Sequence, residues 1–292
     1  MGDIYKKIFP TTLFFDTEYV PCLETACKIY KLDPEDAPPN VILDEIYRLN
    51  GATEQDPVPM LKFMLYKVIA ISGLVRKYTR SRNGDFEVSL QLFSLPKELD
   101  SGLYTEKIIL EKFLNSIGQN KPQIIGWAID QFDLNVLFQR SVINKSIIKD
   151  FCKRPDKPWE GADYFNKNSD HFVDLMECIC GWGLRSRARL DEMALACGIA
   201  GKLGIDGSQV CGVFYNDGLE GWKRIINYCE CDVMTTYLIW LDTMLVSGFL
   251  SEFEYEIERR QAYYLLEELI ETGSEHFVPF LEAWDYEPAP IS

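Results

Sequence analysis

Histidine is scarce in this chain of 292 residues, which contains only His171 and His276. A Ser-His-Asp hydrolase needs a histidine base, and a multi-histidine metal site needs several imidazoles, so both classes are disfavoured. Acidic residues are abundant by comparison, because 45 Asp and Glu give a formal net charge of −15. Chemistry carried by carboxylates is therefore the expectation.

An excess of positive charge is also missing, since 30 Lys and Arg stand against the 45 acidic residues. Broad, non-specific binding to a phosphate backbone requires a large basic face, so this class of protein is disfavoured. A local nucleic-acid site remains compatible with the composition, provided that bound metal ions supply the positive charge.

Long apolar runs and paired cysteines are absent as well. No stretch of roughly 18 uncharged apolar residues occurs, so no membrane span is expected. Residues 1–10 are charged and have no apolar core, which argues against a signal peptide and export. The nine cysteines include no C-x-x-C pair, and neither a zinc ribbon nor a disulfide framework is indicated. Reduced core thiols in a cytoplasmic protein are the expectation.

The most informative stretch is an apolar, β-prone run that leads directly into two carboxylates, Asp16 and Glu18. Because side chains alternate along a strand, both should project from one face, about 7 Å apart. Like charges at the end of a buried strand repel each other, and desolvation penalises both. A divalent cation such as Mg²⁺ or Mn²⁺ would resolve this conflict. The alternative is that one carboxylate caps a turn and the other faces water.

Further strands predict a mixed sheet. Strands at 67–75 and 86–92, joined by a turn at Asn83-Gly84, should continue from the first strand as an antiparallel meander. A helix opened by Thr105 leads to a strand at 123–127, which indicates a right-handed crossover onto a parallel neighbour. Before these elements, residues 19–59 are rich in proline and charge and should form a surface insertion with one short helix near 43–49.

Basic residues gather near the predicted turn, at Arg76, Lys77, Arg80 and Arg82. This cluster is interpreted either as a solvated turn or as an edge that contacts phosphate. Helices are predicted at 221–246 and at 251–271. The second of these is acidic, and it either docks a protein partner or packs on its own domain.

Two later motifs supply further acidic side chains. Asp133, in Phe132-Asp133-Leu134, stands near the start of a predicted helix, where the helix dipole favours a negative charge. Tyr228 and Asp232 are four residues apart on a predicted helix and therefore share one face. Taken singly, each motif also has an ordinary structural explanation.

Taken together, D-x-E in a first strand, F-D-L after a strand-to-helix turn and Y-x-x-x-D in a late helix resemble the DEDD exonuclease superfamily, in its tyrosine-bearing branch. Residues 124–134 are similar to the proofreading domain of bacterial B-family DNA polymerases. Residues 198–232 resemble stand-alone predicted 3′-5′ exonucleases. The histidine-bearing branch is disfavoured, because Asn227 stands five residues before Asp232.

The resemblance implies an α/β, RNase H-like fold, with a central mixed β-sheet flanked by helices and a C-terminal helical extension. The exonuclease domain would span residues 1–246, with the surface insertion at about 20–60. Residues 247–292 would form the extension and an acidic tail.

The same resemblance implies a metal-dependent 3′-5′ exonuclease that hydrolyses the 3′ ends of single-stranded DNA by a two-metal mechanism. Four carboxylates would bind two Mg²⁺ or Mn²⁺ ions: Asp16, Glu18, Asp133 and Asp232. Tyr228 would orient the attacking water. Three neighbouring residues would contact the substrate: Phe15, Thr17 and Phe132.

One departure from the family pattern concerns Ala128, because the family usually has asparagine at this position, in the turn before F-D-L. With alanine at this position, the chain lacks a polar side chain that is expected near the substrate or the Asp133 turn. Two other functions stay open, namely an exoribonuclease with the same chemistry and a non-catalytic nucleic-acid-binding module on the same fold.

Overall fold

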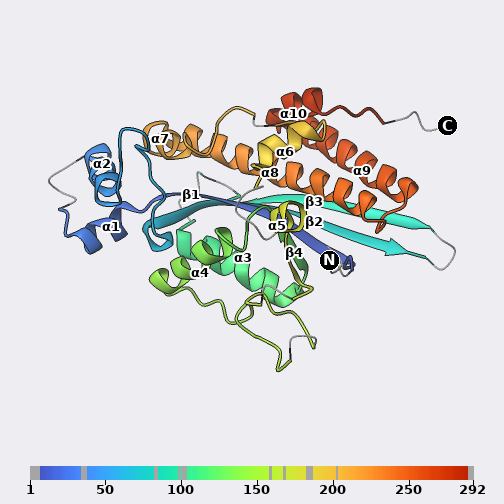
Figure 1. Ribbon diagram of the computed structural model, residues 1–292, viewed down its shortest axis with the longest axis horizontal. Coiled ribbons are helices and arrows are strands. Elements are labelled where there is room, and N and C mark those ends of the chain that lie inside the picture. Colours follow the sequence, from blue (N-terminus) through green and yellow to red (C-terminus); the bar gives the residue numbers. More distant parts are fainter. Residues whose placement is uncertain are drawn as a thin grey trace.

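The computed structural model describes residues 7–33, 38–81, 85–97, 99, 104–157, 160–166, 169–181, 187–201 and 203–288. Its centre is a five-stranded sheet in the order β3-β2-β1-β4-β5 (Figure 1). The strands are β1 (Thr11–Pro21), β2 (Tyr66–Arg80), β3 (Phe86–Leu95), β4 (Gln123–Gly126) and β5 (Phe172–Asp174). Pairing is antiparallel for β1–β2 and β2–β3 and parallel for β1–β4 and β4–β5. The predicted mixed α/β sheet is confirmed.

Helices cover both faces of this sheet (Figure 1). One face carries α3 (Glu106–Asn120) and α4 (Asp133–Asn144), and the other carries α8 (Gly218–Val246). Each face of the sheet has its own hydrophobic core, and successive side chains of β1 point into different cores. Phe14 packs edge-on against Tyr237 and Trp240 of α8, whereas Phe15 packs on Phe113 of α3. Side chains next to each other in β1 thus lie in different cores.

The expected surface insertion is more ordered than predicted. β1 continues to Pro21, and two helices follow, α1 (Leu23–Tyr30) and α2 (Pro39–Leu49), instead of one short helix. Their apolar faces form a small core of their own, which includes Ala26, Ile42 and Ile46. Pro39 occupies the first position of α2, where no backbone N–H is needed, so proline starts this helix instead of interrupting it.

The C-terminal segment packs on the rest of the chain. α9 (Glu252–Glu271), the 3₁₀ turn Glu275–Phe277 and α10 (Val278–Ala283) follow α8, and α9 contacts both α8 and β3. Leu266, Phe280 and Trp284 lie in the same hydrophobic cluster as Phe14 and Trp240. The alternative in which the acidic helix packs on its own domain is therefore what the structure shows.

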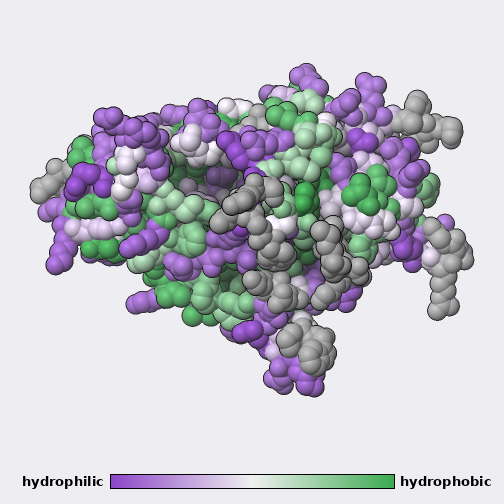
Figure 2. Space-filling model, in the orientation of Figure 1, coloured by the Kyte–Doolittle hydropathy of each residue, from purple (hydrophilic) through white to green (hydrophobic). Residues whose placement is uncertain are grey.

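Short elements complete the fold: the 3₁₀ turn Phe63–Leu65, α5 (Leu175–Cys180), α6 (Leu190–Ala196) and α7 (Val210–Asn216). The predicted Thr105 cap is confirmed, since its hydroxyl accepts a hydrogen bond from the Ile108 N–H. The predicted Asn83-Gly84 turn lies outside the described residues. Hydrophilic and hydrophobic residues are interspersed over the face in Figure 2, and no described helix combines the length and apolar character needed to cross a membrane.

Candidate active site

The two carboxylates of β1 lie where the neighbouring strand has ended. β4 pairs with β1 only from Thr12 to Phe14. β4 ends at Gly126, where an added Cβ would lie 2.9 Å from the Phe15 carbonyl oxygen and 2.3 Å from the Ile129 side chain, and the chain turns over the next residues. A larger residue would push the chain away from β1, so glycine permits the tight turn that brings α4 toward the carboxylates.

Asp133 is the first residue of α4, as the F-D-L motif predicted, and it is buried. The Thr17 hydroxyl donates a short hydrogen bond to Asp133 Oδ1. This bond joins β1 to the start of α4 across 116 residues of sequence. The orientation of the Asp133 carboxylate therefore depends on a side chain of β1.

Asp174 holds the turn that precedes Asp133. Its Oδ1 accepts a hydrogen bond from the Ala128 N–H at 3.2 Å, and its Oδ2 accepts one from the Asp130 N–H at 3.1 Å. The same carboxylate accepts from the Glu177 N–H at 3.2 Å and so caps α5. Asp174 therefore links the end of β5 to the loop that positions Asp133.

Tyr228 and Asp232 lie one turn apart on α8, close enough for the charge of Asp232 to act on the Tyr228 phenol. Cys229 follows Tyr228 in the sequence; it is buried, and its side chain faces β1. Its thiol lies 3.4 Å from the Asp16 carbonyl oxygen and 3.6 Å from Asp16 Oδ2. The sequence interpretation treated this cysteine as a core thiol and missed its contact with the site.

The acidic side chains are close enough to affect one another. Ligand atoms of Asp16, Glu18 and Cys229 all lie within 4.8 Å of one another. Burial raises the pKa of Asp16 well above its usual range, and the charges of Asp133 and Asp232 raise it further. Burial also raises the pKa of Asp133 to about 7, although the hydrogen bond from Thr17 opposes this change. Glu18 thus lies beside Asp16 in β1, and Asp133 of α4 and Asp232 of α8 are near enough for their charges to act on Asp16, so the four predicted carboxylates form one acidic group.

This group fits a hard divalent cation. Partly or fully buried carboxylates that repel one another are costly without a compensating positive charge, and the raised pKa values express that cost. Carboxylate oxygens are the donors that Mg²⁺ and Mn²⁺ favour. Asp16, Glu18, Asp133 and Asp232 are the residues that would hold such ions.

The expected substrate contacts need correction at two positions. Phe15 is 1% exposed and packs on Phe113, because strand alternation directs it away from Asp16 and into the α3 core. Thr17 is buried, and its hydroxyl is committed to Asp133. Phe132 is half-buried beside Phe63, with ring centroids 5.3 Å apart, and remains a candidate for substrate contact.

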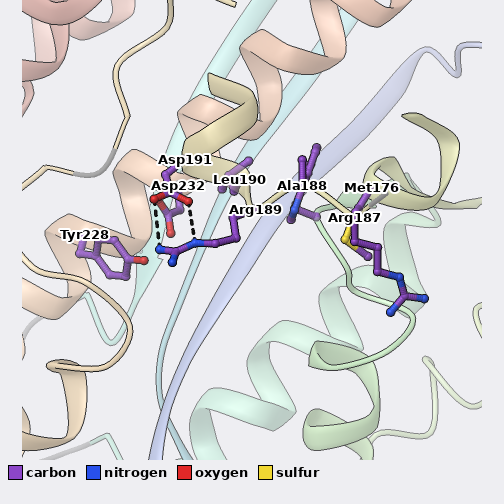
Figure 3. A pocket seen from close by; sticks show the side chains of 9 residues that line it. Met176, Arg187, Ala188, Arg189, Leu190, Asp191, Tyr228 and Asp232 are labelled. Atoms are coloured by element: carbon purple, nitrogen blue, oxygen red, sulfur yellow. Dashed lines mark hydrogen bonds and ion pairs between the residues drawn. The ribbon is translucent and has the colours of Figure 1, made fainter. Parts of the chain in front are cut away.

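A pocket of about 390 Å³ opens beside Tyr228 and Asp232 (Figure 3). The remaining residues that line it come from the end of β4, from α5 and from the segment leading into α6: Trp127, Met176, Arg187, Ala188, Arg189, Leu190 and Asp191. The sequence interpretation did not single out the two arginines. The signal available in the sequence was their R-x-R spacing.

Comparison with known proteins identifies a family and a likeness to solved structures. A family described as a predicted 3′-5′ exonuclease related to the exonuclease domain of PolB matches residues 58–284. No curated protein matches the chain. Among solved structures, the chain is similar to the family B DNA polymerase from the hyperthermophilic archaeon Pyrobaculum calidifontis, with 14% identity and a TM-score of 0.43 over 88% of this chain. It spans 29% of that polymerase's length.

Proposed function

Because this chain belongs to the family of predicted 3′-5′ exonucleases related to the exonuclease domain of PolB, we propose that it removes nucleotides from the 3′ ends of single-stranded DNA. The membership confirms the resemblance inferred from the motifs. The proposed enzyme is a cytoplasmic, metal-dependent phosphodiesterase whose two-metal site is formed by Asp16, Glu18, Asp133 and Asp232.

The convergence of these four carboxylates is the observation that supports the proposal. They come from β1, α4 and α8: the charges of Asp133 and Asp232 act on Asp16, Glu18 lies beside Asp16, and Asp232 lines the pocket together with Tyr228. When bound, divalent cations would lower the pKa of an attacking water and balance the charge on the leaving oxygen. Four carboxylates would balance the charge of two such ions, so an acidic protein can still bind an anionic backbone.

Tyr228 is assigned to hold the attacking water. Burial raises the pKa of its phenol above the usual value, and the charges of Asp232, Glu18 and Asp16 raise it further. The hydroxyl therefore stays protonated at neutral pH and acts through hydrogen bonding, not as an anionic base. Its place one helical turn from Asp232, on the wall of the same pocket, supports this assignment.

The test is cleavage of end-labelled single-stranded DNA, duplex DNA and RNA in Mg²⁺, Mn²⁺ or EDTA. Ladders that shorten from the 3′ end of single-stranded DNA only when metal is present are expected. Asp16→Ala and Asp232→Ala should abolish them while the protein stays folded, and Tyr228→Phe should lower the rate by about 10²–10⁴-fold.

Asp44→Ala, at an exposed acid on α2, is the matched control and should cleave like the unaltered protein. Intact oligonucleotides after prolonged exposure to active protein and Mn²⁺ would overturn the proposal. Preferred degradation of RNA would replace the DNA substrate by RNA and leave the chemistry unchanged.

A further inference from the structure

The pocket beside Tyr228 combines apolar surface with positive charge. Trp127, Met176 and Leu190 supply the apolar surface, whereas Arg187 and Arg189 supply two guanidinium groups. Such a mixture suits a nucleotide, which has a flat apolar base and an anionic phosphate. The chain has a net charge of −15, so two arginines beside Asp232 provide positive charge in an otherwise acidic region.

Arg187 is fixed in place by a buried partner. Its guanidinium donates to Glu177 Oε1 at 2.8 Å and, through a short bond, to the Gln131 side chain. Glu177 is 4% exposed, and Gln131 donates to it as well. The network joins the segment before α6 to α5 and to the turn that precedes Asp133. Arg187 therefore shapes the pocket wall, with its charge largely balanced by Glu177.

Arg189 is held far less tightly. Its Nε and Nη2 each lie 3.1 Å from a carboxylate oxygen of Asp191, and its side chain is 63% exposed. Figure 3 shows the Tyr228 hydroxyl pointing toward this guanidinium, across the pocket. An exposed ion pair contributes about 0–1 kcal/mol, so an incoming phosphate competes readily with Asp191. The planar fork of arginine binds two phosphate oxygens at once.

We propose that this pocket holds one nucleotide of the substrate strand, with its phosphate on Arg189 and its base against Trp127. The inference rests on the proposed nuclease function and deepens it by naming the residues that bind the strand. Because an unpaired base is needed to reach the Trp127 ring, the pocket favours a single strand over a duplex.

Binding is measured first, by fluorescence anisotropy of a labelled single-stranded oligonucleotide in EDTA, where no metal-dependent cleavage occurs. Arg189→Ala should raise Kd by about 10–100-fold, the equivalent of one charge-assisted hydrogen-bond pair. It should also reduce the slope of log Kd against log salt by about one. Arg189→Lys should recover only part of the affinity, and Trp127→Met should weaken binding by at least about 5-fold.

Arg48→Ala is the matched control, because Arg48 on α2 is also exposed and paired with a nearby carboxylate, that of Glu45. Its Kd and salt slope should equal those of the unaltered protein. Equal affinity of Arg189→Ala and the unaltered protein at every salt concentration would overturn the inference.

Cleavage then locates the nucleotide and separates this inference from the proposed function. The p-nitrophenyl ester of thymidine 5′-monophosphate contains a single nucleotide. Loss of activity of Arg189→Ala on both this ester and an oligonucleotide would place the terminal nucleotide in the pocket. Loss of activity on the oligonucleotide alone would place the nucleotide next to the terminal one in the pocket. Weaker binding by Arg189→Ala in a protein that cleaves neither substrate would reject the nuclease and keep the binding pocket.

Discussion

At the scale of single residues, Thr17 illustrates how the site depends on groups that hold its carboxylates. Its side chain lies on the face of β1 opposite to Asp16, and its hydroxyl reaches Asp133. Alternation along β1 thus places Asp16 and Glu18 in the site and gives the intervening residue a positioning role. The same alternation accounts for the wrong expectation at Phe15, which shares the Thr17 face.

Replacement of Thr17 by valine tests this role. Thr17→Val keeps the shape of the side chain but leaves Asp133 Oδ1 without its donor, so kcat should fall by about 10-fold, the equivalent of one net hydrogen bond. Thr17→Ser restores the hydroxyl and should recover most of the rate. Steady-state kinetics on single-stranded DNA measure both, and equal kcat for valine and serine variants would contradict the positioning role.

Ala128 stands where the resemblance led us to expect asparagine, and its backbone has an unusual conformation. It has a φ of 61°, in the left-handed region, where an alanine is strained and asparagine is better tolerated. Ala128→Asn should therefore stabilise the protein by up to about 1 kcal/mol. Urea denaturation measures the change. Ala52→Asn, at a residue without a positive φ, should give no such gain, and an equal gain at both positions would remove the conformational explanation.

At the scale of elements, a buried ion pair joins the sheet to the C-terminal helix. Arg76 Nε on β2 donates to Glu258 Oε1 on α9 at 2.9 Å, and both side chains are fully buried. The Tyr237 hydroxyl on α8 donates to Glu258 Oε2 at 2.6 Å. Arg76 was expected in a solvated or phosphate-contacting turn. That expectation is wrong for this residue, because α9 covers it.

Breaking this pair should destabilise the protein strongly. Glu258→Gln leaves the Arg76 charge buried without a counter-ion, which costs about 3–5 kcal/mol of unfolding free energy. The double variant Arg76→Met with Glu258→Met removes both charges, and its free energy of unfolding should fall by less than that of Glu258→Gln. Glu24→Gln, which breaks the exposed pair with Lys28, should cost less than about 0.5 kcal/mol. Chemical denaturation measures the free energy of unfolding of all three variants. A decrease for Glu258→Gln no larger than that for Glu24→Gln would contradict this account.

At the scale of the whole molecule, the segment after Val246 contributes to the central core. Leu266, Phe280 and Trp284 share a cluster with Phe14 of β1 and Trp240 of α8, and the family match continues to residue 284. A boundary at residue 246 between an exonuclease domain and an extension remains a prediction from the sequence. The packing favours cooperative unfolding of both parts.

Truncation at residue 246 tests the boundary. Removal of α9 and α10 uncovers the apolar surface of α8 and leaves Arg76 without Glu258. The truncated chain should lose its single cooperative unfolding transition and bind a hydrophobic dye such as ANS. Full-length protein under the same conditions is the control. A truncated chain that unfolds at the same urea concentration would show instead that residues 247–292 are a separable extension.

The sequence by itself determined the local geometry of this protein. Alternation along β1 predicted that Asp16 and Glu18 share a face, and helical spacing predicted the same for Tyr228 and Asp232. These relations depend on backbone dihedral angles within a few residues, so short-range patterns contain them. The order of the motifs along the chain also indicated the family. The spacing within a single motif would not have been enough for this.

Only the tertiary structure decided which side chains meet. The contact of Cys229 with Asp16, the bond from Thr17 to Asp133, the burial of Arg76 and the place of Arg189 at the pocket join segments far apart in the chain. Such contacts depend on how helices pack on the two faces of the sheet. The same residue in the same local pattern is solvated or buried according to the element that covers it.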